Sequence, residues 1–160
     1  MKKLYTGLLR ISIGFVFLWA FFDKLLGLGF ATLSERAWLA GGSPTTGYLM
    51  NAPKGPFANV YQGLAGNPLI DYLFMLGLLG VGLAFVLGIA LRFASLAGAT
   101  MMVLMYLSVF PPANNPIIDE HIIYALVLLV LAALNAGEEM GFAKQWSKSK
   151  IVKLLPFLKN

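Results

Sequence analysis

The chain has 160 residues, of which 59% are hydrophobic and 12% are charged. This excludes an ordinary soluble domain, in which about half of the residues are apolar and about a quarter are charged. The absence of cysteine excludes disulfides, thiolate metal ligands and cysteine chemistry, and the net charge of +5 comes from short basic segments beside apolar spans, so nucleic-acid binding is not expected.

The first apolar segment, residues 8–30, is long enough to cross a bilayer, because 23 helical residues extend about 35 Å. It carries Arg10 near one end and Asp23 and Lys24 near the other. Charges inside a span usually have a partner or a function. We interpret the segment as an uncleaved first transmembrane helix, with Arg10 snorkelling to the inner interface.

Residues 31–68 contain many glycines and prolines, which interrupt helices, and they are too numerous for a simple hairpin loop. The segment also contains Trp38, Tyr48, Phe57 and Tyr61, whereas disordered segments are poor in aromatic residues. We therefore expect a structured cap over the outer end of the helices. The alternative is a disordered loop.

Residues 69–91 and 93–110 form the second and third predicted spans. Small residues at Gly80, Ala84 and Gly88 are spaced four apart, which allows another helix backbone to approach closely. The pattern predicts that these two helices pack as a tight hairpin.

Residues 119–136 form the fourth predicted span, with Asp119 as its N-cap and Glu120 favoured by the helix dipole. The domain then ends near residue 140. The tail, residues 141–160, mixes five lysines with aromatic and aliphatic residues. Such a segment suits an anionic lipid surface.

The distribution of basic residues predicts the orientation of the spans. Placing both termini in the cytoplasm puts nine of the twelve lysines and arginines on the inner side, as the positive-inside rule requires. The sequence thus predicts an all-α integral membrane protein, a four-helix bundle that passes the plasma membrane four times.

This topology gathers polar residues at the outer end, together with aromatic rings. The candidate site residues are Trp19, Asp23, Lys24, Arg36, Trp38, Asp119, Glu120, His121 and Tyr124. The alternatives are structural: Lys24 pairs with Asp119, Glu120 or Glu35 to join the first and fourth helices, and the tryptophans are interfacial anchors. With one histidine and no cysteine, a metal site is not expected, and the alternative is a carboxylate-rich site for a hard cation.

Three groups of residues carry a family resemblance over about residues 4–140. They are Leu9-Arg10 with Gly14-Phe15 and Asp23-Lys24, then Gly80-Val81-Gly82-Leu83 with Leu87-Gly88 ahead of Arg92, and Asp119-Glu120-His121 with Tyr124-Ala125-Leu126. In their order and spacing the chain resembles the DoxX/DoxD family of small four-helix membrane proteins. The cap, with Thr46-Gly47-Tyr48-Leu49, is closer to the DoxD branch.

The resemblance implies a membrane subunit of a thiosulfate:quinone oxidoreductase that works with a second, DoxA-like subunit. Lys24, Arg36 and Asp23 would then form the thiosulfate site. Trp19, Trp38 and Tyr124 would surround the quinone, and His121 with Asp119 and Glu120 would handle protons. There are two alternative hypotheses. The first is a non-catalytic scaffold, assembly factor or lipid-binding protein, alone or as a homo-oligomer, and the second is a small carrier.

Overall fold

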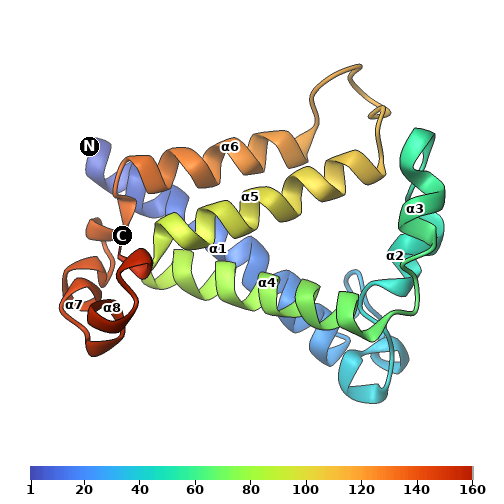
Figure 1. Ribbon diagram of the computed structural model, residues 1–160, viewed down its shortest axis with the longest axis horizontal. Coiled ribbons are helices and arrows are strands. Elements are labelled where there is room, and N and C mark those ends of the chain that lie inside the picture. The colour runs from blue at the N-terminus through green and yellow to red at the C-terminus, as the bar shows by residue number, and fades with distance from the viewer. Residues whose placement is uncertain (160) are drawn as a thin grey trace.

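The computed structural model describes residues 1–159, in which the regular elements are all helices (Figure 1). The long helices are α1 (Lys2–Leu26), α4 (Pro68–Leu87), α5 (Leu91–Ser108) and α6 (Glu120–Ala133). Between α1 and α4 lie η1 (Ser34–Arg36), η2 (Trp38–Ala40), α2 (Thr46–Asn51), η3 (Gly55–Phe57) and α3 (Ala58–Gln62). After α6 come η4 (Ala136–Glu138), α7 (Ala143–Ser147), α8 (Lys150–Leu154) and η5 (Pro156–Leu158).

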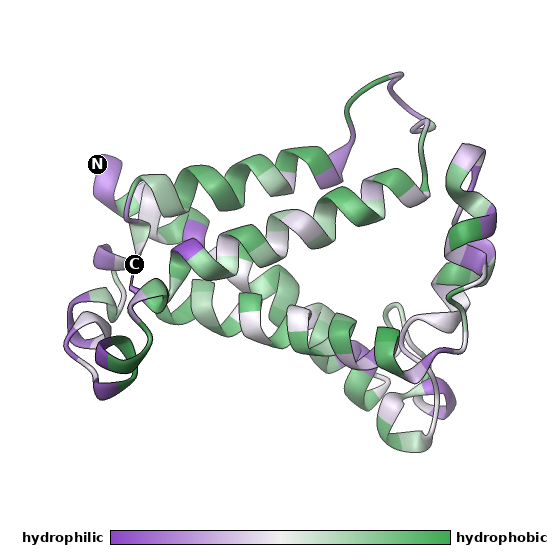
Figure 2. Cartoon of the chain, viewed as in Figure 1, coloured by the Kyte–Doolittle hydropathy of each residue, from purple (hydrophilic) through white to green (hydrophobic). Residues whose placement is uncertain are grey.

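Three of these helices, α1, α4 and α5, are long and apolar enough to cross a membrane. Figure 2 shows that the long helices are apolar along most of their length. Helix α6 is also apolar, but its 14 residues extend only about 21 Å, less than the roughly 30 Å of a bilayer core. The N-terminus and the C-terminal helices α7 and α8 lie at the same end of the long helices (Figure 1).

The helix boundaries differ from the predicted spans because two glycines end helices early. Helix α1 begins at Lys2 rather than residue 8. It ends at Leu26 because Gly27 has a φ of 67° and donates its N–H to the Asp23 carbonyl. Helix α4 ends at Leu87 rather than residue 91, because Gly88 has a φ of 72°. Helices α5 and α6 cover Leu91–Ser108 and Glu120–Ala133, against predictions of 93–110 and 119–136.

The most extensive helix contacts are between α1 and α4 and between α5 and α6. In the first pair, a Cβ on Gly14 would lie 2.7 Å from the Val86 nitrogen, and one on Gly82 would lie 2.7 Å from Leu18 Cγ. Glycine is therefore required for this close approach. The prediction that Gly80 lets α4 pack closely against α5 was wrong, because within residues 1–159 a Cβ at Gly80 meets no atom within 4 Å. A dimer face, the other role that this line of small residues allows, stays a prediction.

Helices α4 and α5 are close at their connecting turn and diverge toward the end where α2 and α3 lie (Figure 1). The segment between α1 and α4 connects the start of α4 to the end of α5 through hydrogen bonds. At the start of α4, the Asp71 carboxylate accepts hydrogen bonds from Ser43 and Thr45. At the end of α5, the Ser108 carbonyl accepts the Lys54 N–H at 2.9 Å. The predicted hairpin is thus tight only near its turn.

Candidate functional site

A cavity of about 650 Å³ lies in the wedge between α4 and α5, and we call it the cap cavity. Its volume falls in the range of about 300–1,000 Å³ that is usual for small-molecule sites. The walls are mostly apolar, and residues from α2 and α3 close the wide end. The lining includes Tyr48, Tyr61, Leu73, Phe74, Gly77, Thr100, Met101, Leu104 and Ser108.

Among the residues that the structure describes, Lys24 is the one charged residue that lines the cap cavity. It is half-buried, and its Nζ atom lies 5.9 Å from the centre of the Phe74 ring, a cation–π arrangement. The neighbouring Asp23 is only 2% exposed, and its carboxylate accepts the N–H groups of Phe30 and Ala31 at 3.2 and 3.0 Å. Asp23 therefore stabilises the turn after α1 and does not line the cavity.

Within residues 1–159, Lys24 has no acidic partner at ion-pair distance. The ion pairs found within residues 1–159 are Lys3 with Glu139 and His121 with Asp119. The alternative in which Lys24 joins the first and fourth helices through Asp119, Glu120 or Glu35 is therefore wrong. A half-buried cation in an apolar wall gains more from a bound anion or polar oxygen than a solvated one does.

We call the part of the cavity lining that comes from the segment between α1 and α4, from Pro44 to Leu64, the roof of the cap cavity. Two tyrosines of the roof form hydrogen bonds to α5. The Ser108 hydroxyl donates to the Met105 carbonyl at 2.6 Å, so the Tyr48 hydroxyl, 2.7 Å away, donates to Ser108. The Tyr61 hydroxyl donates to the Leu104 carbonyl at 2.7 Å. Burial raises the pKa of Tyr48, and although the Ser108 hydrogen bond opposes this rise, the charge of Asp119 adds to it. Tyr48 therefore stays protonated at neutral pH.

Asp71 holds the other side of the roof and was not among the predicted site residues. Its buried carboxylate accepts from the Thr45 hydroxyl at 2.5 Å, the Ser43 hydroxyl at 2.9 Å and the Thr45 N–H at 3.2 Å. These hydrogen bonds hold Ser43 and Thr45 against the start of α4, and Thr45 thereby forms part of the cavity wall. The available signal was a Ser-Pro-Thr-Thr run, rich in donors, ahead of an acid in the first turn of α4.

The predicted proton-handling residues lie at the start of α6. Asp119 is the N-cap and accepts the N–H groups of His121 and Ile122 at 3.0 and 3.3 Å. Its second oxygen lies 2.8 Å from His121 Nδ1, and both side chains are largely buried, at 10% and 15% exposure. Burial acts to raise the pKa of Asp119, but the bonds from His121 and Ile122 and the charge of His121 outweigh burial and lower it.

We expect Asp119→Ala to lower the free energy of unfolding by about 1 kcal/mol at neutral pH, because the α6 N-cap is lost. The folded-state pKa lies below the ordinary value of 3.8, so the contribution is complete above that value and disappears as the pH falls through the folded-state value. Denaturant unfolding at pH 7 and pH 3 measures both effects. Glu120→Ala, an exposed neighbour, is the control, and equal losses for both variants would contradict the prediction.

The remaining predicted residues are not brought together around the cap cavity. Trp19 is 37% exposed on α1 and packs edge-on against Phe30. Trp38 packs edge-on against Tyr72, with ring centres 5.2 Å apart. The other three are Tyr124, half-buried on α6, and the exposed Arg36 and Glu120. Of all the candidates, Lys24 is the one that lines the cavity within the described chain.

The prediction that Arg10 snorkels to the inner interface was wrong, because this side chain is 0% exposed. Its five N–H groups all donate to backbone carbonyls. The acceptors are Phe85 and Val86 at the end of α4, Ala136 in η4, and Glu139 and Met140 after it. With every donor used, Arg10 joins three chain segments and leaves no donor for a ligand.

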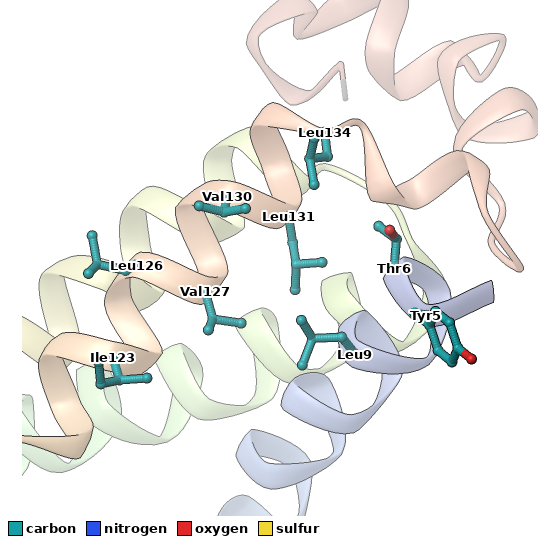
Figure 3. A pocket seen from close by; sticks show the side chains of 9 residues that line it. All are labelled: Tyr5, Thr6, Leu9, Ile123, Leu126, Val127, Val130, Leu131 and Leu134. Carbon is teal, nitrogen blue, oxygen red and sulfur yellow. The ribbon is translucent and has the colours of Figure 1, made fainter. Parts of the chain in front are cut away.

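A second, shallower groove of about 330 Å³ lies between α1 and α6 (Figure 3). Figure 3 shows Leu9 and Thr6 of α1 opposite Val127 and Leu131 of α6. The groove is lined mainly by aliphatic residues. It lies where α1 and α6 contact each other less extensively than α1 contacts α4 or α5 contacts α6. Across residues 1–159, no three histidine or acidic residues are grouped so that they could hold a metal ion.

Comparisons of this chain with models of protein families, with curated protein sequences and with solved structures found no match. The resemblance to the DoxX/DoxD family therefore stays a hypothesis that rests on the sequence motifs.

Proposed function

We propose that the chain is a multi-pass protein of the plasma membrane that binds a lipid-soluble amphiphile in the cap cavity. In this proposal α6 is the fourth span beside α5 although its helix is shorter than the bilayer core, because the N-terminus and the C-terminal helices α7 and α8 lie at the same end of the long helices (Figure 1). Both termini are then cytoplasmic. The excess of basic residues at the end that carries the termini supports this orientation.

One observation carries the binding proposal: Lys24 is half-buried in the wall of a large apolar cavity and forms no ion pair with any residue of the described part of the chain. The apolar walls suit a hydrocarbon tail or ring. The ammonium group suits an oxygen of the head group, as a carbonyl, carboxylate or phosphate, because a charge-assisted hydrogen bond gains strength where water is excluded. A scaffold without a ligand requires neither the cavity nor the cation.

We expect Lys24→Gln to reduce the affinity for the amphiphile about tenfold or more, since a hydrogen bond to a charged group contributes about 1.5–3 kcal/mol. The protein is extracted gently with its native lipids, and bound lipids and quinones are quantified per chain by mass spectrometry. Lys54→Gln, which removes an exposed lysine outside the cavity lining, is the matched control.

A second variant tests the cavity without touching the charge. Thr100→Phe adds bulk to a lining residue on α5 and is expected to reduce ligand retention while the helical circular dichroism stays unchanged. If both Lys24→Gln and Thr100→Phe retain as much ligand as Lys54→Gln, the proposal is overturned.

Quinone-linked oxidoreduction is the second candidate function. The observation that favours it is the contact between Asp119 and His121, 2.8 Å apart at the start of α6, in which the charge of Asp119 acts on Tyr48 in the cavity wall. Quinone reduction consumes two protons and two electrons, and oxidation of two thiosulfate ions to tetrathionate supplies two electrons. In this proposal Lys24 binds a quinone oxygen, the Asp119 and His121 pair supplies protons, and a DoxA-like subunit completes the enzyme.

The same preparation distinguishes the two candidates. Quinone absorbance is followed after thiosulfate is added, in wild type, Lys24→Gln and His121→Ala. Thiosulfate-dependent reduction that both variants lose while folded supports the redox function. Bound quinone without turnover, even after membrane extract is added back, supports binding alone.

A further inference from the structure

The basic tail, residues 141–159, is a folded unit fixed to the bundle. The Trp146 indole N–H donates to the Leu158 carbonyl at 2.7 Å and closes the unit. The Phe142 N–H donates to the Leu87 carbonyl at the end of α4 at 2.9 Å, and Val152 is buried at 6% exposure. The tail therefore has a defined surface rather than a fluctuating one.

This unit lies where the long helices end. The Phe157 ring packs against Phe93 in the first turns of α5, with ring centres 5.9 Å apart. Figure 1 places α7 and α8 at the end of the molecule that also carries the N-terminus. If α4 and α5 span a bilayer, the tail lies at its surface, beside the lipid head groups.

The tail is positively charged without internal compensation. It contains five lysines and no aspartate or glutamate. The five are Lys144, Lys148, Lys150, Lys153 and Lys159, and all are exposed. Of the two acids just before the tail, Glu139 pairs with Lys3 at 3.5 Å. Positive charge held at a membrane surface attracts anionic lipids.

Apolar side chains of the same unit are exposed between these lysines. Leu154 is 79% exposed, Phe157 is 59% exposed and Ile151 is 49% exposed. Figure 2 shows the alternation of apolar and hydrophilic residues over α7 and α8. Interleaved lysines and large apolar side chains fit the boundary between head groups and acyl chains, where each finds its own environment.

We propose that the basic tail is a binding site for acidic phospholipids, with the lysines contacting the phosphates and the apolar side chains inserted beneath them. The tail then fixes the depth of the inner end of the bundle in an anionic leaflet. This proposal is independent of the cap cavity, which lies at the opposite end of α4 and α5.

The test is a titration of the full chain in detergent with short-chain phosphatidylglycerol and phosphatidylcholine, with bound lipid counted by native mass spectrometry. The wild type should prefer phosphatidylglycerol, and the preference should fall with added salt. Lys150→Gln with Lys153→Gln should reduce it about tenfold or more, since each lysine near an anionic surface contributes a factor of about five.

Two controls isolate the tail. Arg36→Gln with Lys54→Gln removes the same charge from the opposite end and should leave the preference unchanged. Lys150→Arg with Lys153→Arg keeps the charge and should retain it. An unchanged preference in the glutamine pair of the tail, or an equal loss in the pair from the opposite end, overturns the proposal, and an acidic protein surface would then be the better partner for the tail.

Discussion

Arg10→Ala is expected to lower the free energy of unfolding by about 3–5 kcal/mol, because a buried and fully hydrogen-bonded charged side chain is lost. The guanidinium is 0% exposed and satisfies carbonyls of Phe85 and Val86 that lie in the last turn of α4, where a helix has no internal donors. Its charge also faces the negative end of the α4 dipole. Removing it leaves buried acceptors without a partner.

Arg10→Lys tests whether the fork of donors matters or only the charge. An ammonium group has three donors against five, so most of the loss should persist. Unfolding in a denaturing detergent, followed by helical circular dichroism, measures the change. Arg92→Ala, an exposed arginine in the first turn of α5, should change stability by less than about 0.5 kcal/mol. Equal stability of the Arg10 and Arg92 variants would contradict the proposed role.

The existence and type of the helices could be predicted from the sequence because apolar length alone requires them in a bilayer. Their ends could not, because the decisive property was a backbone angle. Gly88 fitted a small-residue packing line in the sequence, but its φ of 72° ends α4 and turns the chain into α5. A glycine in an apolar run is compatible with either role.

The role of Arg10 could not be predicted for a related reason. Its acceptors are five backbone carbonyls, among them those of Phe85, Ala136 and Met140, and a carbonyl has no sequence signature. From the sequence, an arginine near the end of a span is expected to extend toward the membrane surface. Buried carbonyl acceptors for it become visible only in the folded structure. Sequence reasoning found that a charge there needs a partner and missed that the partner is the main chain.

The candidate site was predicted in part. The sequence predicts Lys24 as a site residue because a charge within an apolar span usually has a partner or a function, and Lys24 does line the cap cavity. The aromatic residues Trp19 and Trp38 were grouped with it by topology alone, which places residues at one end of a bundle but not around one volume. The cavity depends on the divergence of α4 from α5, and Leu73 and Met101 in its walls resemble any lipid-facing residues in the sequence.

Gly14→Leu is expected to destabilise the protein by about 1–3 kcal/mol and to reduce ligand retention in the cap cavity. Even a Cβ at this position would lie 2.7 Å from the Val86 nitrogen and 2.9 Å from Phe85 Cβ, so α1 must move away from α4. Arg10 and Lys24 are on the same helix as Gly14. A displacement of α1 therefore disturbs the carbonyl contacts at one end and the position of the cavity lysine at the other.

Gly80→Leu provides the matched control, because Gly80 is exposed on α4 and a Cβ there meets no atom of the described residues within 4 Å. It should retain both stability and ligand. The two readouts, detergent unfolding and bound lipid per chain, separate the contributions. If Gly14→Leu lowers stability but leaves ligand retention equal to that of Gly80→Leu, the seating of α1 against α4 does not position Lys24. The cavity would then be organised by the roof bonds of Asp71 and Ser108 alone.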